Sequence, residues 1–597
     1  MELEDVLERI LSNATSVFGG QHRTHIFTVL LFDTKARLIR WDRAGYVVSE
    51  PFDYVSEPQK LILFIWRFAR MSPEQRGHDT SASRVFPDSA DHELMKERAK
   101  PPEMDVEGAA ALHGYARVAF AESLDHATFW RLGVDDAKKG PQYFLVGKPH
   151  VHAPGLAGRG TRTYVAIDAA DPYGPFVYLK DAWCNVEPGF DLEGNILERL
   201  NSQDDGGPVR FVPTVRCHGY VKDNKTSSQK AWRESRAQAL NQLDSVHSLK
   251  AYRHYRLVVD EVCLPLSDFR CARELVLLLM CVIKAHGEAY NLKGLIHGDI
   301  SAGNVLIYPT LKRHPRTGEM KATRVALLAD WELAQRVDQV DEGFIQTHRV
   351  GTWRFMSAHA LSHPWKRAVG VQDEMESIFH LLLYQAIRYL PHNCSSVARF
   401  VHEHFDGYER SHGAYYGGTA KNGAVRTGEL LNRRLHPLLF YVTEPTPLES
   451  ENSSISDDEP SDEHCDPALH PINGLFAEIL HSLKAQYRLY DIDSTPSNAR
   501  QFSPPEWTPE ELNDPMLLLQ GFEDFIDGGF MQRHRLQDAR TESWRADLAA
   551  AERAQLEADA ARLASHDAMV DLFVAYYMRV AWPKKDRVPD KLPADGQ

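Results

Sequence analysis

The stretch GLIHGDISAGNVLIY, residues 294–308, places polar and charged side chains between two apolar flanks, where a buried strand would simply continue. His297, Asp299 and Asn304 form the pattern H-x-D-x-x-x-x-N. That spacing is typical of a phosphotransferase catalytic loop, in which the aspartate orients the attacking hydroxyl and can accept its proton. The asparagine oxygen binds magnesium, and the histidine packs as a brace. Taken alone, the stretch also fits a polar turn between a helix and a strand.

A second chemical element is the segment ALLADWELA, an apolar strand that ends at Asp330 and Trp331. Kinases supply their second magnesium ligand at such a place as Asp-Phe-Gly, whereas here Trp-Glu follows the aspartate. Because a hard cation prefers oxygen ligands, we expect Asn304 and Asp330 to be the metal ligands. A single aspartate that ends a strand is common, so this inference depends on Asn304.

A third element is FVYLKDAW, in which Lys180 follows a strand pattern close to V-A-I-K. This pattern predicts a lysine that reaches the α- and β-phosphates of ATP. Thirteen residues later, LEGNILERL places Glu193 on a helix that would bring a carboxylate to Lys180. Glu198 on the same helix is the alternative partner. Without the other motifs, a surface lysine on a strand would explain Lys180 equally well.

Length and composition restrict the classes of protein. A chain of 597 residues with 43% hydrophobic residues is expected to form two or three domains. A formal net charge of −15 argues against a general nucleic-acid or membrane-surface binder. Seven scattered cysteines without a CxxC pair indicate neither a disulfide framework nor a zinc site, so we expect a reducing compartment, cytoplasmic or nuclear. The apolar run LVLLLMCVI is shorter than the roughly 20 residues of a membrane span.

The elements that would position these residues form five segments. Residues 1–140 are predicted to be α+β without a catalytic cluster, and residues 141–262 contain short strands separated by Gly and Pro, typical of an antiparallel sheet. Residues 263–443 begin with a long buried helix that has Ser267 or Asp268 near its cap. Residues 444–470 are acidic and Ser-rich, which predicts a disordered linker. Residues 471–597 are predicted to be mainly helical.

The segment from about Gln142 to Leu383 resembles the fungal-type protein kinase family, a divergent branch of the protein-kinase-like fold. The motifs that carry the resemblance occur in order: GRGTRTYVAID, FVYLKDAW, RLVVDEVCLPLSDF, LIHGDISAGNVLI, LLADWELA, VGTWRFMSAHAL and DEMESIFHLLLY. The preceding HIFTVLLFDTKARLIRWDRAGYVVSEPFDY is similar to the segment before the catalytic core of that family. The resemblance implies an α+β, two-lobed fold with an antiparallel-sheet N-lobe and a mainly helical C-lobe. It also implies ATP and Mg²⁺ as cofactors and a Ser/Thr-type activity on a protein substrate.

Three positions depart from the usual protein kinase pattern. Gly298 replaces the arginine that follows the catalytic-loop histidine, so a phosphorylated activation loop would lack its cationic partner. Ser301 replaces the lysine two residues after the catalytic aspartate, which removes a positive charge from the transferred phosphoryl group. His359 stands where the Ala-Pro-Glu motif has its structural carboxylate.

The nucleotide lid is irregular as well. Gly155, Gly158 and Gly160 in PGLAGRGTRTY do not form G-x-G-x-x-G, although Gly158 and Gly160 are predicted to let backbone amides approach phosphate. The segment RLVVDEVCLPL is the expected hinge between the lobes, with ATP in the cleft and backbone groups from Glu261 to Cys263 binding adenine.

Three interpretations remain open at the level of sequence. The leading one is an active protein kinase, with Thr352 near the substrate hydroxyl and Asp373 or Glu374 anchoring the catalytic loop. The second is a small-molecule phosphotransferase of the aminoglycoside or choline kinase type, against which the segment GTWRFMS speaks. The third is a pseudokinase that binds ATP as a scaffold, which Gly298 and Ser301 favour. No nucleic-acid or membrane partner is expected, and the oligomeric state is left open.

Overall fold

The computed structural model describes residues 3–101, 112–152, 155–186, 191–236, 249–313, 317–337, 351–363, 369–411, 414–432, 434–444, 468–493 and 550–592. The chain divides into two compact units, which are described separately. The first comprises Met1–Phe355 and Pro364–Gly370, and the second Met356–His363 and Val371–Gln597. Most of the predicted acidic linker, residues 445–467, lies outside the described residues. The five predicted segments stay predictions.

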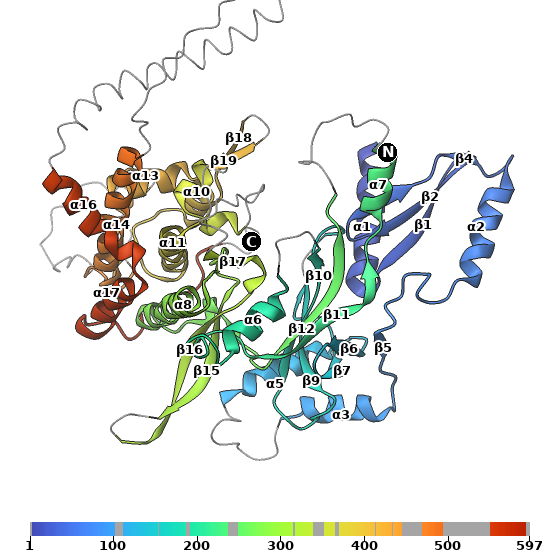
Figure 1. Ribbon diagram of the computed structural model, residues 1–597, viewed down its shortest axis with the longest axis horizontal. Helices are drawn as coiled ribbons and strands as arrows, with labels where there is room; N and C mark the ends of the chain where they lie inside the picture. Colours follow the sequence, from blue (N-terminus) through green and yellow to red (C-terminus); the bar gives the residue numbers. More distant parts are fainter. Residues whose placement is uncertain are drawn as a thin grey trace, which may run out of the picture. The chain divides into compact units, whose positions relative to one another are not determined.

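The first unit opens with a small α+β layer. Helix α1 (Leu3–Gly20) is followed by an antiparallel sheet of β1 (His25–Phe32), β2 (Lys35–Asp42), β3 (Gly45–Val48) and β4 (Phe52–Asp53), and then by α2 (Pro58–Arg70). These elements are drawn in blue in Figure 1. Alternating apolar residues of β1 and β2 turn one face of the sheet toward α1, where Phe18, Ile26 and Trp41 form a buried cluster. Leu156, far away in the sequence, completes that cluster.

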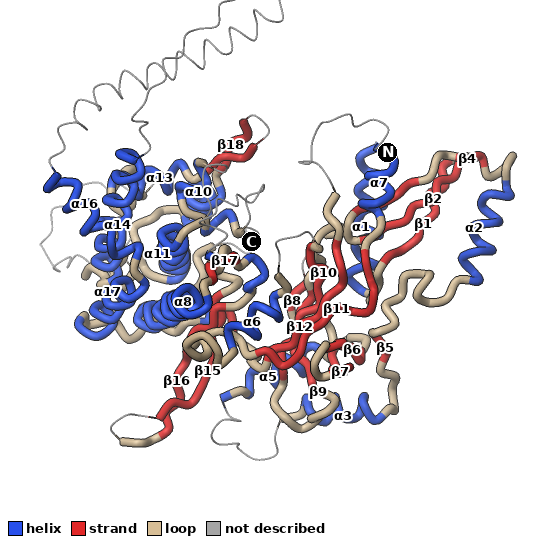
Figure 2. The backbone as a smooth tube through the Cα atoms, in the orientation of Figure 1, coloured by secondary structure: helices blue, strands red, loops and turns tan. Residues whose placement is uncertain are grey.

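The main sheet of the first unit is antiparallel, as the sequence predicts. Its strands run in the order β11 (Val215–Lys225), β12 (Tyr252–Val259), β10 (Val177–Asn185), β9 (Arg162–Asp168), β7 (Gly140–Val146), β6 (Trp130–Asp136) and β5 (Ala82–Arg84), with β8 (Val151–His152) beside β9. Figure 2 shows these strands as one curved red layer. Strands β5 and β6 come from the segment before residue 140, so that segment contributes directly to the sheet.

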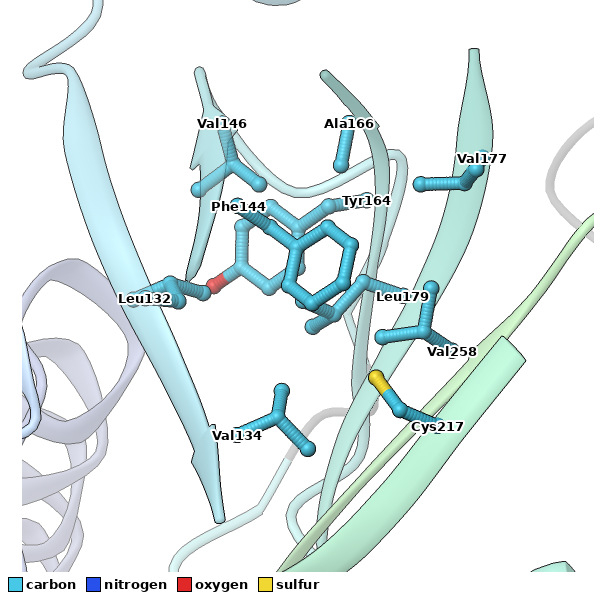
Figure 3. Packing of buried hydrophobic residues seen from close by; sticks show 10 residues of the cluster. All are labelled: Leu132, Val134, Phe144, Val146, Tyr164, Ala166, Val177, Leu179, Cys217 and Val258. Carbon is cyan, nitrogen blue, oxygen red and sulfur yellow. The ribbon is translucent and has the colours of Figure 1, made fainter. Parts of the chain in front are cut away.

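One face of this sheet holds its main core. Side chains from six strands meet there, as Figure 3 shows: Leu132, Val134, Phe144, Val146, Tyr164, Ala166, Val177, Leu179, Cys217 and Val258. The opposite face is covered by α3 (Ala90–Ala99) and α5 (Gly114–Ser123), which pack Met95 and Phe120 against Leu145, Val165 and Ile167. Because successive residues of a strand point to opposite faces, both cores fix the register of β7 and β9.

Further elements of the first unit include those that flank the catalytic loop. Helix α8 (Ala272–Lys293) packs on β14 (Leu295–Ile296) and β16 (Met320–Leu328). Strand β15 (Val305–Arg313) pairs with β16 and with β13 (Leu264–Pro265), and β14 pairs with β17 (Gln335–Arg336). The predicted cap at Ser267 or Asp268 is wrong, because residues Leu266–Asp268 form a separate 3-10 turn and Cys271 precedes the helix. Two shorter helices, α6 (Glu193–Asn201) and α7 (Ser228–Arg236), belong to this unit as well.

By length and composition alone, α8 would be able to cross a membrane. Most of its apolar residues are buried within the first unit, as they are in a core helix. Gly294 ends the helix in the left-handed conformation, with φ of 60°, and thereby turns the chain into β14 and the catalytic loop.

The second unit is mainly helical. It contains α10 (Ala358–Ser362), α11 (Val371–Tyr389), α12 (Val397–Val401), α13 (Thr419–Thr427), α14 (Ile472–Asp493), α16 (Ala550–Ala564) and α17 (His566–Arg579), with one hairpin of β18 (Tyr408–Ser411) and β19 (Ala414–Gly417). Helix α11 is buried on nearly all sides and forms the centre of the unit. The described part of the chain is therefore α+β with antiparallel sheets, in agreement with the predicted class.

Candidate active site

The predicted catalytic loop lies between β14 and β15 and is braced by His297. The Asp299 N–H donates to His297 Nδ1 (3.2 Å), so the proton of the ring is on Nε2, which donates to the Ala329 carbonyl (3.0 Å). The imidazole also meets the edge of the buried Trp331 ring, with centroids 4.6 Å apart. Burial lowers the pKa of His297, which keeps the imidazole neutral at pH 7.

Hydrogen bonds fix the orientation of the Asp299 carboxylate. Asn304 Nδ2 donates to Asp299 Oδ2 (3.0 Å) and to its carbonyl oxygen (2.9 Å), and the Thr352 N–H donates to Asp299 Oδ1 (2.7 Å). The two strand ends are joined by the Ala329 N–H, which donates to the Asn304 carbonyl (2.8 Å). The structure therefore brings together Asp299, Asn304 and Thr352, and places Asn304 beside the residue that precedes Asp330.

The glycine at position 298 has a steric reason. Its φ is +82°, and a Cβ atom there would lie 2.8 Å from the Leu333 carbonyl oxygen. Residues with a side chain rarely adopt such a φ, and the contact is shorter than real Cβ contacts. The loop therefore excludes the usual arginine at Gly298. Ser301, where a lysine is usual, is buried.

Lys180 is the centre of a charged cluster. From β10 its Nζ lies 2.6 Å from Glu193 Oε2 on α6, 2.7 Å from Asp330 Oδ1 and 3.6 Å from Glu332 Oε2. Of the two candidate partners on α6, Glu193 is the one at Lys180, whereas Glu198 pairs with Lys138 at 2.6 Å.

A left-handed residue directs two carboxylates into this cluster. Asp330 has φ of +59° and precedes the 3-10 helix Trp331–Leu333. The Trp331 side chain is fully buried, and its Nε1 donates to the Leu328 carbonyl (2.8 Å). With the tryptophan held inward, Asp330 and Glu332 on either side both face Lys180. Glu332 was not among the predicted residues, although an acid in the place of the glycine of Asp-Phe-Gly was a visible signal.

Arg159 is the second cation of the cluster and was also not predicted. Its Nη2 forms ion pairs with Asp330 Oδ1 (3.4 Å) and with Glu332 Oε2. Burial alone would lower the pKa of both cations, but the facing carboxylates raise the pKa of Lys180 and of Arg159 above their ordinary values. The same cations hold the pKa of Asp330 well below its ordinary value although the side chain is partly buried, whereas burial raises the pKa of Glu193.

The glycine lid is attached to the N-terminal layer by Arg43. Arg43 Nη1 donates to the carbonyl oxygens of Gly155 (2.9 Å) and Leu156 (3.2 Å), and the Gly158 N–H donates to the Arg43 carbonyl (2.8 Å). A Cβ on Gly160 would lie 2.3 Å from the Arg43 guanidinium carbon, so a side chain there would displace the Arg43 guanidinium. The Gly158 amide, predicted to approach phosphate, is thus engaged with Arg43.

The predicted hinge connects β12 to β13. The Glu261 carboxylate accepts hydrogen bonds from Thr214 N (2.8 Å) and Thr214 Oγ1 (2.7 Å), and burial raises its pKa. The Tyr115 hydroxyl donates to the Val262 carbonyl. Burial also raises the pKa of the Cys263 thiol, which therefore stays protonated. Tyr115 binds one of the predicted adenine-binding backbone groups, and its helix α5 belongs to the segment before residue 140.

The acidic and amide oxygens of the cluster fit a magnesium ion. Carboxylate oxygens of Glu193, Asp330 and Glu332 lie within 4.8 Å of one another. The predicted ligand Asn304 uses its amide nitrogen for both bonds to Asp299, which leaves the amide oxygen as the cation ligand. Such a set consists of the hard oxygen donors that Mg²⁺ prefers. Asp330 belongs to both groups and would be the shared ligand.

In the second unit, the motif that ends in His359 is held without its usual glutamate. Glu376 on α11 accepts the backbone N–H of the residue after Ser357 (2.7 Å). Ser357 Oγ donates to Asp373 Oδ1 (2.6 Å) on the same helix, and Glu374 is buried beside it. A carboxylate of α11 therefore binds the backbone at the place of the missing one.

Comparison with known proteins identifies one family. No curated protein matches the chain. The family model described as "Fungal protein kinase" matches residues 2–386, which is more than half of the 597 residues and includes the N-terminal layer, the main sheet, the catalytic loop and the Lys180 cluster. The chain therefore belongs to the fungal protein kinase family.

Proposed function

We propose that this protein transfers the γ-phosphate of Mg-ATP to a serine or threonine hydroxyl of a protein substrate. The proposal depends on one observation, that two carboxylates from distant parts of the chain lie at the same lysine. Lys180 lies 2.6 Å from Glu193, which is 13 residues away, and 2.7 Å from Asp330, which is 150 residues away. Protein kinases need this lysine–glutamate pair together with the metal-binding aspartate. Family membership supports kinase activity, and the two-lobed arrangement around an ATP cleft is part of the proposal.

In the proposed mechanism the residues of the loop have separate tasks. Asp299 accepts the proton of the attacking hydroxyl, and Asn304 and Thr352 hold its carboxylate in one orientation through the hydrogen bonds described above. Lys180, held by Glu193, binds the phosphates. Magnesium bound at Asp330 and Asn304 would neutralise negative charge on the transferred phosphoryl group. Because His297 stays neutral and braced, the loop keeps its shape during turnover.

A pseudokinase is the second candidate, favoured by one observation. Ser301 is buried at the place of the usual catalytic-loop lysine, so this loop provides one cation fewer for the transition state. A scaffold would retain nucleotide binding and show no transfer of phosphate.

Two aspartate variants test the proposal. Asp299→Asn is expected to keep the Kd for Mg-ATP within a few-fold of wild type and to reduce phosphate transfer by roughly 100-fold or more, the scale of a lost general base. Asp330→Asn is expected to weaken ATP binding only when magnesium is present, because an amide is a poorer ligand for a hard dication. Calorimetry with and without EDTA measures binding, and labelled ATP measures transfer.

The outcomes separate the candidates. A wild-type chain that binds Mg-ATP but phosphorylates neither itself nor any protein would favour the scaffold. Phosphorylation of a small alcohol or amine without labelling of protein would point to a small-molecule phosphotransferase. We also propose a cytoplasmic or nuclear location. The cysteines of the described residues are free thiols, which supports a reducing compartment.

A further inference from the structure

The proposed reaction needs more positive charge than the catalytic loop provides. In phosphoryl transfer, negative charge spreads over the oxygens of the transferred group, and fixed cations stabilise it. Lys180 is held against Glu193 and Asp330. Ser301 supplies no charge. A second cation near Asp330 would complete the site, and the structure offers one from the lid.

Arg159 is that cation. Its carbonyl oxygen accepts the Trp183 N–H (2.8 Å), which ties the lid to β10 three residues beyond Lys180. Its guanidinium faces Asp330 and Glu332, the same carboxylates that face Lys180. The two cations therefore pair with the same candidate magnesium ligands, although Lys180 lies on β10 and Arg159 in the loop before β9.

The position of Arg159 is built into the fold. The residues before it are held by the Arg43 guanidinium and by insertion of Leu156 into the buried cluster with Phe18 and Trp41. The Gly158 N–H, one residue before Arg159, donates to the Arg43 carbonyl (2.8 Å). With contacts on both sides, the arginine is carried by a fixed loop.

The guanidinium has donors to spare. Its ion pairs run through Nη2, and its buried Nε has no hydrogen-bond partner among the described residues. Buried donors are nearly always satisfied in native proteins, so such a group calls for an acceptor. A guanidinium offers five N–H donors in a planar fork that matches phosphate oxygens, and it stays charged at any physiological pH.

We propose that Arg159 binds the terminal phosphate of ATP and supplies the positive charge that Ser301 cannot. This inference rests on the proposed function, because it concerns the same nucleotide. In the absence of nucleotide, Asp330 and Glu332 hold the guanidinium in place. Three carboxylates and two cations leave the cluster with one net negative charge, which favours a magnesium ion, while Lys180 and Arg159 are the groups that attract the phosphates.

The test compares nucleotides that differ only in their phosphates. Full-length wild type, Arg159→Ala and Arg159→Lys are titrated with Mg-ATP, Mg-ADP and adenosine in a calorimeter. Losing a charge-assisted contact to the terminal phosphate is expected to raise the Kd for Mg-ATP by about 10- to 100-fold in Arg159→Ala. The Kd values for Mg-ADP and adenosine should change by less than about 3-fold, a small fraction of that loss. Arg159→Lys, which keeps the charge but loses the fork, should fall between.

Arg210→Ala is the matched control. Arg210 is an exposed arginine of the same unit that forms an ion pair with Glu288 outside the cluster. Arg210→Ala should bind Mg-ATP, Mg-ADP and adenosine as wild type does. Thermal unfolding of each variant without nucleotide shows whether the fold is intact, and Arg159→Lys retains the test if Arg159→Ala does not fold.

Three results would overturn the proposal. Equal losses for Mg-ATP and Mg-ADP would place the arginine elsewhere, and unchanged affinity would mean that it contacts no phosphate. Tighter binding of Mg-ATP by Arg159→Ala would show that Arg159 only pairs with Asp330 and Glu332 and thereby blocks the site. In each case wild type still binds ATP, so the proposed function survives. A wild type that binds no nucleotide overturns both proposals together.

Discussion

Lys180→Met separates the role of the lysine in folding from its role in nucleotide binding. The side chains of Lys180 and Glu193 are 13% and 5% exposed, so the pair is buried. Deleting one partner of a buried pair costs about 3–5 kcal/mol, because the other charge is left uncompensated. Asp330 keeps Arg159 and is 29% exposed. Glu193, whose pKa is already raised by burial, can take up a proton. We therefore expect Lys180→Met to lower the free energy of unfolding by about 3 kcal/mol, the lower end of that range.

A second substitution isolates the part due to Glu193. In Lys180→Met/Glu193→Gln no buried charge remains on α6, so most of the lost stability should return, since removing both partners of a pair costs little. Binding of Mg-ATP should not return, because the phosphate contact of the lysine is still missing. That contact is worth about 10- to 100-fold in Kd.

Urea unfolding followed by circular dichroism measures the free energy of unfolding, and calorimetry measures the Kd for Mg-ATP. The reasoning fails if Lys180→Met binds Mg-ATP as tightly as wild type does. It fails equally if the double variant recovers both stability and binding, since the lysine would then serve only to neutralise Glu193.

Three further variants test separate parts of the structure. Arg43→Met should weaken Mg-ATP binding about 10-fold, the scale of a lost charged hydrogen bond, because the lid loses its attachment; calorimetry measures the change. Gly298→Arg, which would restore the common motif, should instead lower the melting temperature, because φ is +82° and the Leu333 carbonyl is in the way. Burial lowers the pKa of His404, which stacks on Phe400, to about 3. In the unfolded chain the pKa of this histidine is about 6.5, so the unfolded state takes up a proton before the folded state does as the pH falls. Acidification from pH 7 to pH 5 should therefore lower the free energy of unfolding by about 2 kcal/mol through His404. Urea unfolding at the two pH values should show that His404→Phe lacks this loss.

Matched controls exist for two of these. Gly303 lies in the same loop, has no positive φ, and a Cβ there would meet no atom closer than 4.0 Å, so Gly303→Ala should be tolerated where Gly298→Ala is not. His402 is exposed two residues before His404, so His402→Phe should leave the acid sensitivity unchanged. If Gly298→Ala is as stable as wild type, the steric explanation of the missing arginine is wrong. If His404→Phe loses as much stability on acidification as wild type, other groups are responsible.

Local patterns in the sequence predicted the antiparallel strands and part of the Lys180 cluster, namely Glu193 and Asp330. Alternation of apolar residues reveals a strand, and the spacing of Asp299 and Asn304 reveals a loop, because both depend only on near neighbours. The sequence favoured Glu193 as the partner of Lys180 but kept Glu198 as the alternative. Two residues five positions apart on a helix point in different directions. Only the packing of α6 determines which of them faces β10.

Arg159 and Glu332 were missed for a related reason. Glu332 reaches the cluster because Asp330 adopts a left-handed conformation and Trp331 is buried, and neither is visible as a pattern in the chain. Arg159 is in place because Arg43, more than 100 residues earlier, holds the lid. Likewise, β5 and β6 join the main sheet through pairings that no local periodicity encodes. Contacts between distant segments fix these features.

The most direct test of protein kinase activity is the transfer of label from γ-labelled ATP by the purified full-length chain, with magnesium and a generic protein substrate. We expect label on serine or threonine of the substrate or of the chain itself, dependent on magnesium and reduced by roughly 100-fold or more in Asp299→Asn. A wild-type chain that binds no ATP, with or without magnesium, and transfers no label would contradict the assignment of Lys180, Asn304 and Asp330 to one site.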